Sequence, residues 1–297
     1  MRPVTIFACL LVGWGLVASP PGSAELIDLR NAASGTASLL HHWTFDGATD
    51  AAQRQDKKGT AHLSRVTEGS GTAAGWAPGF GAEGLAASTN RITAQDGGAY
   101  QSTSFNHPDS GTVEYLFNAT DDQKLDGHYV SSQSANRMYM GIFWQSDVGV
   151  GFGNSAWPGP FEAYATGTTT PDLEAGHWYY VAVTYEFSTS PNEFIIDAYL
   201  SDLTEAQTTL THAIDGVTRQ APSGGPGSAP LGIGMQTAAG GQNYFQGYVD
   251  ELAWYDEPLT ASTLQDHLDA IGVPEPTMPA LLILGWALVL ARRRRRA

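Results

Sequence analysis

Cysteine is almost absent from this 297-residue chain. The single one, Cys9, lies in an N-terminal segment in which Arg2 precedes an uncharged apolar run and small residues occupy 22–24. That pattern predicts a cleavable signal peptide over 1–24. The exported chain then has no thiol, which excludes a disulfide, a cysteine nucleophile and a thiolate metal ligand. About 250 residues without disulfides must be held by one sizeable hydrophobic core.

Basic residues are also scarce. Between residues 25 and 275 there are 9 basic and 30 acidic residues, a formal net charge of −21. So acidic a surface argues against binding nucleic acid or anionic lipid. It suits solubility and is compatible with calcium, but it does not by itself indicate a site.

Long amphipathic periodicity and internal repeats are missing as well. Short stretches rich in Val, Ile, Tyr, Phe and Trp alternate with polar and glycine clusters from 39 to 272. Without a repeat of 20–50 residues, a propeller or solenoid is not expected. We predict one all-β domain over 39–272, a jelly-roll sandwich of two antiparallel sheets. Residues 25–38 form a leader with no clear pattern.

Two strands are predicted most strongly, because apolar residues alternate along them. In 111–118 and 177–187 the alternating residues expected on one buried face are Val113, Tyr115 and Phe117, and Tyr179, Val181, Val183 and Tyr185. One short C-terminal helix is predicted after Thr260, which suits an N-cap. Its apolar face would comprise Leu264, Leu268 and Ile271, and it would end at Gly272.

The last 25 residues, 273–297, combine three features in a fixed order. They are Val273-Pro274-Glu275-Pro276, an uncharged stretch over 278–291 and five arginines over 292–296. Proline prevents the preceding helix from continuing. Each arginine resists entry into hydrocarbon by about 2.5–3.5 kcal/mol. The tail would therefore enter a membrane and stop with its arginines on the cytoplasmic side.

This layout resembles the PEP-CTERM sorting signal of Gram-negative bacteria. The resemblance implies recognition by an exosortase, removal of the tail near Pro274-Glu275-Pro276, and export to the cell surface or extracellular matrix, where the family is associated with extracellular polysaccharide. The alternative is a permanent membrane anchor. However, 14 residues form a helix of about 21 Å, short of the roughly 30 Å hydrocarbon core. We therefore expect contact with the inner membrane through 278–291 to be transient.

Four other stretches resemble laminin-G-like domains of the concanavalin A-like lectin/glucanase superfamily. They are Leu40–Asp46, Gly176–Tyr185, Leu231–Gly234 and Phe245–Tyr255, the last followed by Pro258-Leu259-Thr260. In that family the first and last strands lie close together. The resemblance therefore implies that Asp46 lies near Asp250.

Asp46 and Asp250 are the predicted metal ligands. Many relatives carry a calcium ion near these positions, and calcium takes six to eight oxygen ligands. Asp50 could add a further one. The alternative is structural, with Asp46 capping a turn and Asp250 making a buried hydrogen bond.

Catalysis is not predicted. A glycosidase needs two carboxyl groups about 5–5.5 or 6.5–9.5 Å apart, and the Glu-x-Asp-x-x-Glu run of the superfamily's retaining glucanases is missing. Asp250 and Glu251 are adjacent, so a regular strand would point them to opposite faces. The same holds for His41 and His42, to which we assign structural roles. No catalytic or cofactor-binding residue is proposed.

Sugar contacts are predicted at Tyr139, Trp144 and Trp157, which lie among amide and hydroxyl side chains. An aromatic ring can stack on a sugar while amides bind its hydroxyl groups. Core packing is the alternative for these rings. The sequence thus favours an exported, non-catalytic protein that binds extracellular polysaccharide. The alternatives are a structural or adhesive biofilm-matrix protein without a specific ligand and, least favoured, a divergent glycoside hydrolase.

Overall fold

The computed structural model describes residues 24–70, 72–82, 84–93, 96–106, 108–120, 127–132, 137–143, 147–153, 162–164, 173–220, 230–235 and 244–271. Most of the predicted signal peptide and all of the predicted tail, with Pro274, Glu275 and Pro276, lie outside these ranges. So do Trp144, Trp157 and the side chain of Tyr139. Within the described ranges, no helix has the length and apolar character needed to cross a membrane.

The described chain is mostly β-structure. Its helices are α1 (Ala24–Gly35), α2 (Asp50–Gln53) and α3 (Ala261–Ala270), with a 3-10 turn, η1, at Phe80–Ala82. Its strands are β1 (Leu39–Trp43), β2 (Ser64–Glu68), β3 (Gly75–Pro78), β4 (Leu85–Arg91), β5 (Gly97–Ser102), β6 (Gly111–Ala119), β7 (Gly127–Ser132), β8 (Arg137–Phe143), β9 (Asp147–Gly153), β10 (Glu162–Tyr164), β11 (Trp178–Thr189), β12 (Asn192–Asp202), β13 (Thr211–Gln220), β14 (Leu231–Ile233) and β15 (Gly247–Tyr255).

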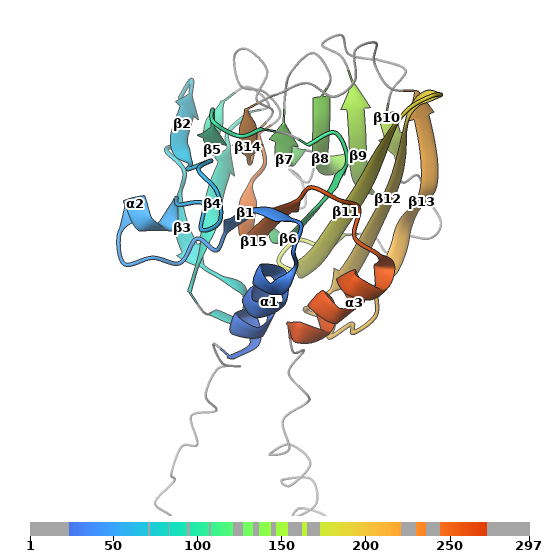
Figure 1. The fold of residues 1–297 in the computed structure, drawn as a ribbon. Helices are drawn as coiled ribbons and strands as arrows, with labels where there is room; N and C mark the ends of the chain where they lie inside the picture. Colours follow the sequence, from blue (N-terminus) through green and yellow to red (C-terminus); the bar gives the residue numbers. More distant parts are fainter. Residues whose placement is uncertain are drawn as a thin grey trace, which may run out of the picture.

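All strand pairs are antiparallel, in the order β10-β9-β8-β7-β14-β5-β4-β15-β6-β11-β12-β13 (Figure 1). β4 joins the two halves of this path, because it pairs with β15 through Ala87–Thr89 and with β5 through Asn90 and Arg91. β1 pairs with β15, with Trp43 opposite Leu252. The first and last strands are therefore neighbours, as the family resemblance implied.

The main hydrophobic core lies between the two halves of the strand path. The strands β6, β11 and β12 contribute buried residues to it, and so do β5, β7 and β14 from the other half: Val113, Tyr115, Phe117, Tyr179, Val181, Val183, Tyr185 and Ile196, with Tyr100, Val130, Leu231 and Ile233. These include the residues predicted from the alternating pattern in 111–118 and 177–187. Period-two alternation thus identified the inward face of both strands.

The opposite face of β6 and β11 is buried too. A second cluster packs Leu116, Tyr180 and Ala182 against residues of α1 and α3, which lie side by side (Figure 1). α3 follows the prediction: the Thr260 side chain accepts a hydrogen bond from the Thr263 N–H at 3.2 Å, and the predicted apolar residues Leu264, Leu268 and Ile271 are buried. The helix itself stops at Ala270.

Helix α1 lies largely within residues 25–38, in which the sequence analysis found no clear pattern. Leu26, Leu29 and Ala33 are buried against the second cluster. Three buried apolar residues in a helix of twelve make a weak pattern, and a helix this short is marginal alone. Packing against α3 and the sheet stabilises it. The domain is accordingly mostly β rather than all-β.

Candidate functional site

The candidate site is centred on an irregularity in β15. The register between β15 and β6 shifts between Asp250 and Ala253, and Glu251 has φ 49°, a left-handed value uncommon for residues other than glycine. A β-bulge of this kind re-aims the side chains next to it. The strict alternation that we expected for Asp250 and Glu251 is therefore wrong here. Both carboxylates lie within electrostatic reach of Asp46 and Arg30.

Asp46 lies just beyond β1, after Phe45, whose φ is 55°. Its carboxylate accepts a hydrogen bond from the Leu85 N–H at 2.6 Å and contacts the Arg30 guanidinium. Gly84 is part of this pocket, because its φ is +55° and an added Cβ would meet the Asp46 carboxylate well inside 3.0 Å. The structure thus brings Asp46 to the neighbourhood of Asp250, where the first and last strands pair.

Asp250 is almost fully buried, with 1% of its surface exposed. One carboxylate oxygen accepts from the N–H of Glu251 at 3.0 Å and the other from the N–H of Phe80 at 3.2 Å. Burial raises the pKa of Asp250 well above its usual range, and the negative charges of Glu251 and Asp46 raise this pKa further. Additional positive charge next to Asp250 would favour the ionised form of its carboxyl group.

Glu251 is a site residue that the sequence analysis missed. Its Oε1 accepts from Arg30 Nε at 2.7 Å. Its Oε2 is buried, lies 3.4 Å from His42 Nε2, and makes no hydrogen bond to any residue that the structure describes. An unsatisfied buried charged oxygen is costly. In the sequence, the available indication was that Glu251 is adjacent to Asp250. The assumption of a regular strand, which would place the two side chains on opposite faces, led us to disregard Glu251.

Arg30 reaches this position from α1. Its guanidinium contacts both Asp46 and Glu251, which are 16 and 221 residues away in the chain. Burial by itself would lower the pKa of Arg30, but the hydrogen bond to Glu251 and the charges of Glu251 and Asp46 raise this pKa above its usual value. Arg30 is therefore a permanent positive charge within the site.

We call Arg30, Asp46, Asp250 and Glu251 the bulge cluster. With His42 counted as neutral and all three carboxyl groups counted as ionised, the cluster has a formal charge of −2; burial and the neighbouring negative charges oppose ionisation of Asp250 by raising its pKa. Its carboxylate oxygens are the ligand type that calcium prefers. One of them, Glu251 Oε2, accepts no hydrogen bond from any residue that the structure describes. However, these carboxylates are not among the described residues whose ligand atoms all lie within 4.8 Å of one another, and Arg30 already contacts two of the three.

Asp50, considered as a further ligand, is directed elsewhere. Its carboxylate accepts from Arg54 at 3.1 Å and Trp76 Nε1 at 2.9 Å, and pairs with Arg65 at 2.5 Å. The hydrogen bond from Trp76 is the main cause that lowers the pKa of Asp50, and burial acts in the opposite direction. Asp50 therefore belongs to a surface network and not to the bulge cluster.

The adjacent histidines contact different carboxylates, as expected for neighbours on a strand. His41 Nδ1 lies 2.6 Å from Asp56 Oδ2, whereas His42 faces Glu251. Burial would raise the pKa of Asp56, but His41 and the N–H groups of Gly59 and His42 lower it to about 2. Asp56 thus stays ionised and organises the loop after β1.

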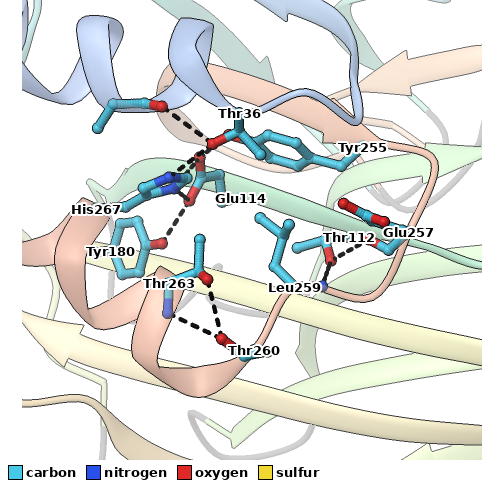
Figure 2. A network of polar contacts seen from close by, with 11 residues as sticks. Thr36, Thr112, Glu114, Tyr180, Tyr255, Glu257, Leu259, Thr260, Thr263 and His267 are labelled. Carbon is cyan, nitrogen blue, oxygen red and sulfur yellow. Dashed lines mark hydrogen bonds and ion pairs between the residues drawn. The ribbon is translucent and has the colours of Figure 1, made fainter.

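A second buried carboxylate, Glu114 of β6, lies beneath the helices (Figure 2). It accepts from Tyr180 at 2.5 Å, from Tyr255, and from His267 Nδ1 of α3 at 3.0 Å. His267 Nε2 is 3.2 Å from the hydroxyl oxygen of Thr36, the residue after α1. We call Glu114, Tyr180, Tyr255 and His267 the Glu114 cluster, which attaches α3 to the sheet.

Charge stabilises the Glu114 cluster. Burial would raise the pKa of Glu114, but the hydrogen bond and charge of His267 lower it. Burial would lower the pKa of His267, but Glu114 raises it. The ionised pair is therefore favoured over the neutral one.

One exposed group of metal-type ligands also occurs among the described residues. Asp197, His212 and Asp215 place ligand atoms within 4.8 Å of one another. His212 Nε2 is 2.8 Å from Asp197 Oδ1, and Tyr199 stacks on the His212 ring at 4.6 Å. Because the Asp215 side chain is 89% exposed, this arrangement is explained by solvated ion pairs.

Comparison with known proteins identifies the family. The family model described as the concanavalin A-like lectin/glucanases superfamily, of laminin-G type, matches residues 93–265. The chain therefore belongs to the concanavalin A-like lectin/glucanases superfamily. No curated protein matches the sequence.

Solved structures share the fold at low sequence identity. Domain 4 of AbnA, a GH43 extracellular arabinanase from Geobacillus stearothermophilus solved with arabinotriose, is 14% identical, with a TM-score of 0.52. The match covers 78% of this chain and 98% of that one. The binding domain of botulinum neurotoxin serotype D/C is 11% identical, with a TM-score of 0.53, covering 79% of this chain and 52% of that one. These similarities establish the fold alone.

Proposed function

We propose that this protein is an exported, non-catalytic carbohydrate-binding protein whose ligand is an extracellular polysaccharide. The observation that carries the proposal is membership of a lectin-type superfamily. The match to 98% of a domain solved in complex with arabinotriose supports it. Tyr139, Trp144 and Trp157 remain the proposed sugar contacts.

The contacts of two described buried carboxylates, Glu114 and Asp56, support a non-catalytic role for these two residues. A glycosidase needs one carboxylic acid and one carboxylate that both face the substrate. Glu114 instead accepts from two tyrosines and His267, and Asp56 accepts from several backbone N–H groups. Both are committed to holding the fold together.

We further propose calcium as a structural ion of the bulge cluster. Asp46 and Asp250, the predicted ligands, would hold it together with Glu251. When bound, calcium would supply positive charge to a cluster that has more carboxylates than cations. The buried and unsatisfied Glu251 Oε2 supports this assignment.

The proposed destination is the cell surface or extracellular matrix, reached by exosortase processing of a membrane-anchored intermediate. The arrangement of the helices supports it. α1 begins at Ala24 and α3 is followed by Ile271, and the two helices lie side by side (Figure 1). The predicted signal peptide and the tail with its 278–291 segment would therefore join the same side of the domain.

A glycan array that includes the producer's own polysaccharide tests the proposed function. Residues 25–272 should bind at least one polysaccharide, and Trp144→Ala and Trp157→Ala should each weaken binding by about tenfold. Trp76→Ala is the control, because Trp76 is engaged with Asp50 in the surface network.

The other outcomes separate the alternatives. A lack of binding to any polysaccharide would reject the proposal and favour a matrix protein without a specific ligand. Release of reducing sugar from a bound polysaccharide would instead indicate a glycoside hydrolase.

A further inference from the structure

The basic residues of this acidic chain are concentrated in one segment. Of the 9 basic residues between 25 and 275, four lie within residues 54–65. We call these four the basic patch: Arg54, Lys57, Lys58 and Arg65. With Asp50 and Asp56 included, residues 50–65 carry a formal charge of +2, whereas the remainder of 25–275 carries −23.

The fold brings the basic patch together around α2 and the loop that leads to β2. Arg54, just after α2, and Arg65 in β2 both pair with the Asp50 carboxylate, at 3.0 and 2.5 Å. The Lys57 ammonium donates to the Ala52 carbonyl of α2 at 3.1 Å. Three basic side chains therefore converge on α2, and the fourth is adjacent to one of them in the chain.

The basic patch keeps positive charge that no described carboxylate neutralises. Asp50 is shared by the two arginines, so its charge balances one of them. Asp56 is buried, and its carboxylate accepts from backbone N–H groups of its own loop and contacts His41. Within the described part of the chain, the two lysines of the patch pair with no carboxylate, and both are exposed. Their ammonium groups are therefore available to an anionic ligand.

The two arginines of the patch are held in position before any ligand binds. The Arg65 guanidinium lies 5.8 Å from the centre of the Trp76 ring, which packs against Tyr100 with ring centres 5.1 Å apart. Arg54 donates to the Leu63 carbonyl at 2.8 Å. A side chain that is already restrained loses less conformational entropy when a ligand binds. These guanidinium groups are thus preorganised, and the Trp76 ring supports Arg65.

We propose that the basic patch binds the acidic groups of the polysaccharide, so that the ligand of this protein is an anionic polysaccharide with sugar carboxylates. The inference rests on the proposed function and names the chemical class of its ligand. The acidic remainder of the surface repels such a polymer, and the patch attracts it. The charge distribution therefore orients the polymer toward α2.

The place of the patch in the fold favours a polysaccharide over a lipid surface. α2 projects from the edge of the domain near β2 and β3, whereas α1 and α3 lie together on another side (Figure 1). The predicted signal peptide and tail join the domain at α1 and α3, so an anionic membrane on that side does not face the patch. A polysaccharide outside the membrane is free to reach it.

Binding of the exported chain to alginate, polygalacturonate and hyaluronate, each compared with its carboxyl-reduced form, tests the proposal. The wild type should bind at least one acidic polymer and lose this binding when the carboxylates of the polymer are reduced to alcohols. Lys57→Gln/Lys58→Gln should weaken the binding about tenfold, because two cationic contacts are removed. Lys57→Arg/Lys58→Arg, which keeps both charges, should bind like the wild type.

The matched control is Ala261→Glu/Ser262→Glu, which changes the net charge by the same −2 at two exposed residues of α3. Its affinity should stay near that of the wild type. Raising the salt from about 0.05 M to about 0.5 M should weaken wild-type binding more than binding by Lys57→Gln/Lys58→Gln, since screening acts on the contacts that this variant lacks. Equal unfolding temperatures would show that the substitutions act on binding and not on folding.

The outcomes separate this inference from the proposed function. If the chain binds only neutral polysaccharides, or if Lys57→Gln/Lys58→Gln binds an acidic polymer as tightly as the wild type, the inference is overturned while carbohydrate binding stands. If no polysaccharide of either kind binds, the proposed function fails and the inference with it. Tighter binding to vesicles that contain an anionic phospholipid than to any acidic polysaccharide would also overturn it.

Discussion

The bulge cluster and the Glu114 cluster are both built around buried carboxylates on strands that pair with each other, β15 and β6. The chain at α1 contributes to each, through Arg30 and Thr36. The two clusters differ in how many of their carboxylate oxygens accept hydrogen bonds. Each oxygen of Glu114 accepts from a tyrosine and from His267. Glu251 Oε2 accepts no hydrogen bond within the described part of the chain and lies 3.4 Å from His42 Nε2. We therefore assign a structural role to the Glu114 cluster and keep the calcium proposal for the bulge cluster.

The largest expected effect comes from breaking the complete cluster. His267→Ala would leave Glu114 buried without its positive partner, which should lower the free energy of unfolding by about 3–5 kcal/mol. Urea denaturation measures this change. His212→Ala, which removes a histidine from an exposed ion pair, should lower it by less than about 1 kcal/mol. Similar losses in the two variants would contradict the structural role of the Glu114 cluster.

Substitution in the bulge cluster should lower the free energy of unfolding less than substitution in the Glu114 cluster. Calcium should affect the stability of the bulge cluster more. Asp250→Asn keeps the shape but places an amide group against one of two backbone N–H donors, at a cost of about 1–3 kcal/mol. In the wild type, millimolar calcium should raise the melting temperature relative to chelator, and in Asp250→Asn this increment should vanish. An unchanged wild-type melting temperature after chelation would count strongly against a structural ion.

Gly84 tests how closely the backbone surrounds Asp46. Gly84→Ala should destabilise the protein by about 1–3 kcal/mol, because alanine is strained at positive φ and its Cβ would collide with the Asp46 carboxylate. Gly75→Ala is the control, since nothing lies within 4 Å of its added Cβ. The denaturation midpoints of Gly84→Ala and Gly75→Ala, each compared with that of the wild type, measure this difference. Equal midpoints would mean that Asp46 is held loosely.

The smallest expected effect is the dependence of stability on pH. The pKa of His267 is raised above 6.5 in the folded state, so its contribution is fully present below pH 6.5 and is lost as the pH rises through the folded pKa. The pKa of Glu114 is lowered below 4.5, so its contribution is present above pH 4.5 and is lost as the pH falls through the folded pKa. The pair should therefore stabilise the fold most between pH 4.5 and 6.5.

Denaturation from about pH 6 to about pH 9 measures this dependence. The free energy of unfolding should fall with rising pH in the wild type and fall less in His267→Gln, which cannot titrate at that position. Parallel curves for the two proteins would show that the pair contributes no pH dependence.

Local pattern was enough to predict the strands and the last helix. Alternation identified Val113, Tyr115 and Phe117 as one buried face, and Thr260 identified the start of α3. The outer face of β6 could not be assigned in this way, because its burial depends on α1 and α3. α1 itself went unpredicted, since its few apolar residues form a helix only against those partners.

The candidate site was predicted in part. The family resemblance placed Asp46 near Asp250, and the pairing of β1 with β15 brings them together. Glu251 was missed because a bulge with φ 49° has no signature in the alternating pattern. Arg30 was missed because its partner Glu251 is 221 residues away, and no local rule connects residues at that separation.

The sequence by itself determined the chemistry that this protein has available: a single cysteine at position 9, a large excess of acidic residues, and strands whose alternating residues must be buried. These follow from composition and from the two-residue period of a β-strand. Only the tertiary structure decided which charges meet, because β1, β15 and α1 converge through long-range packing. That convergence surrounds Glu114 with hydrogen-bond donors. It places Glu251 beside Arg30, with one oxygen that accepts no hydrogen bond from the described residues.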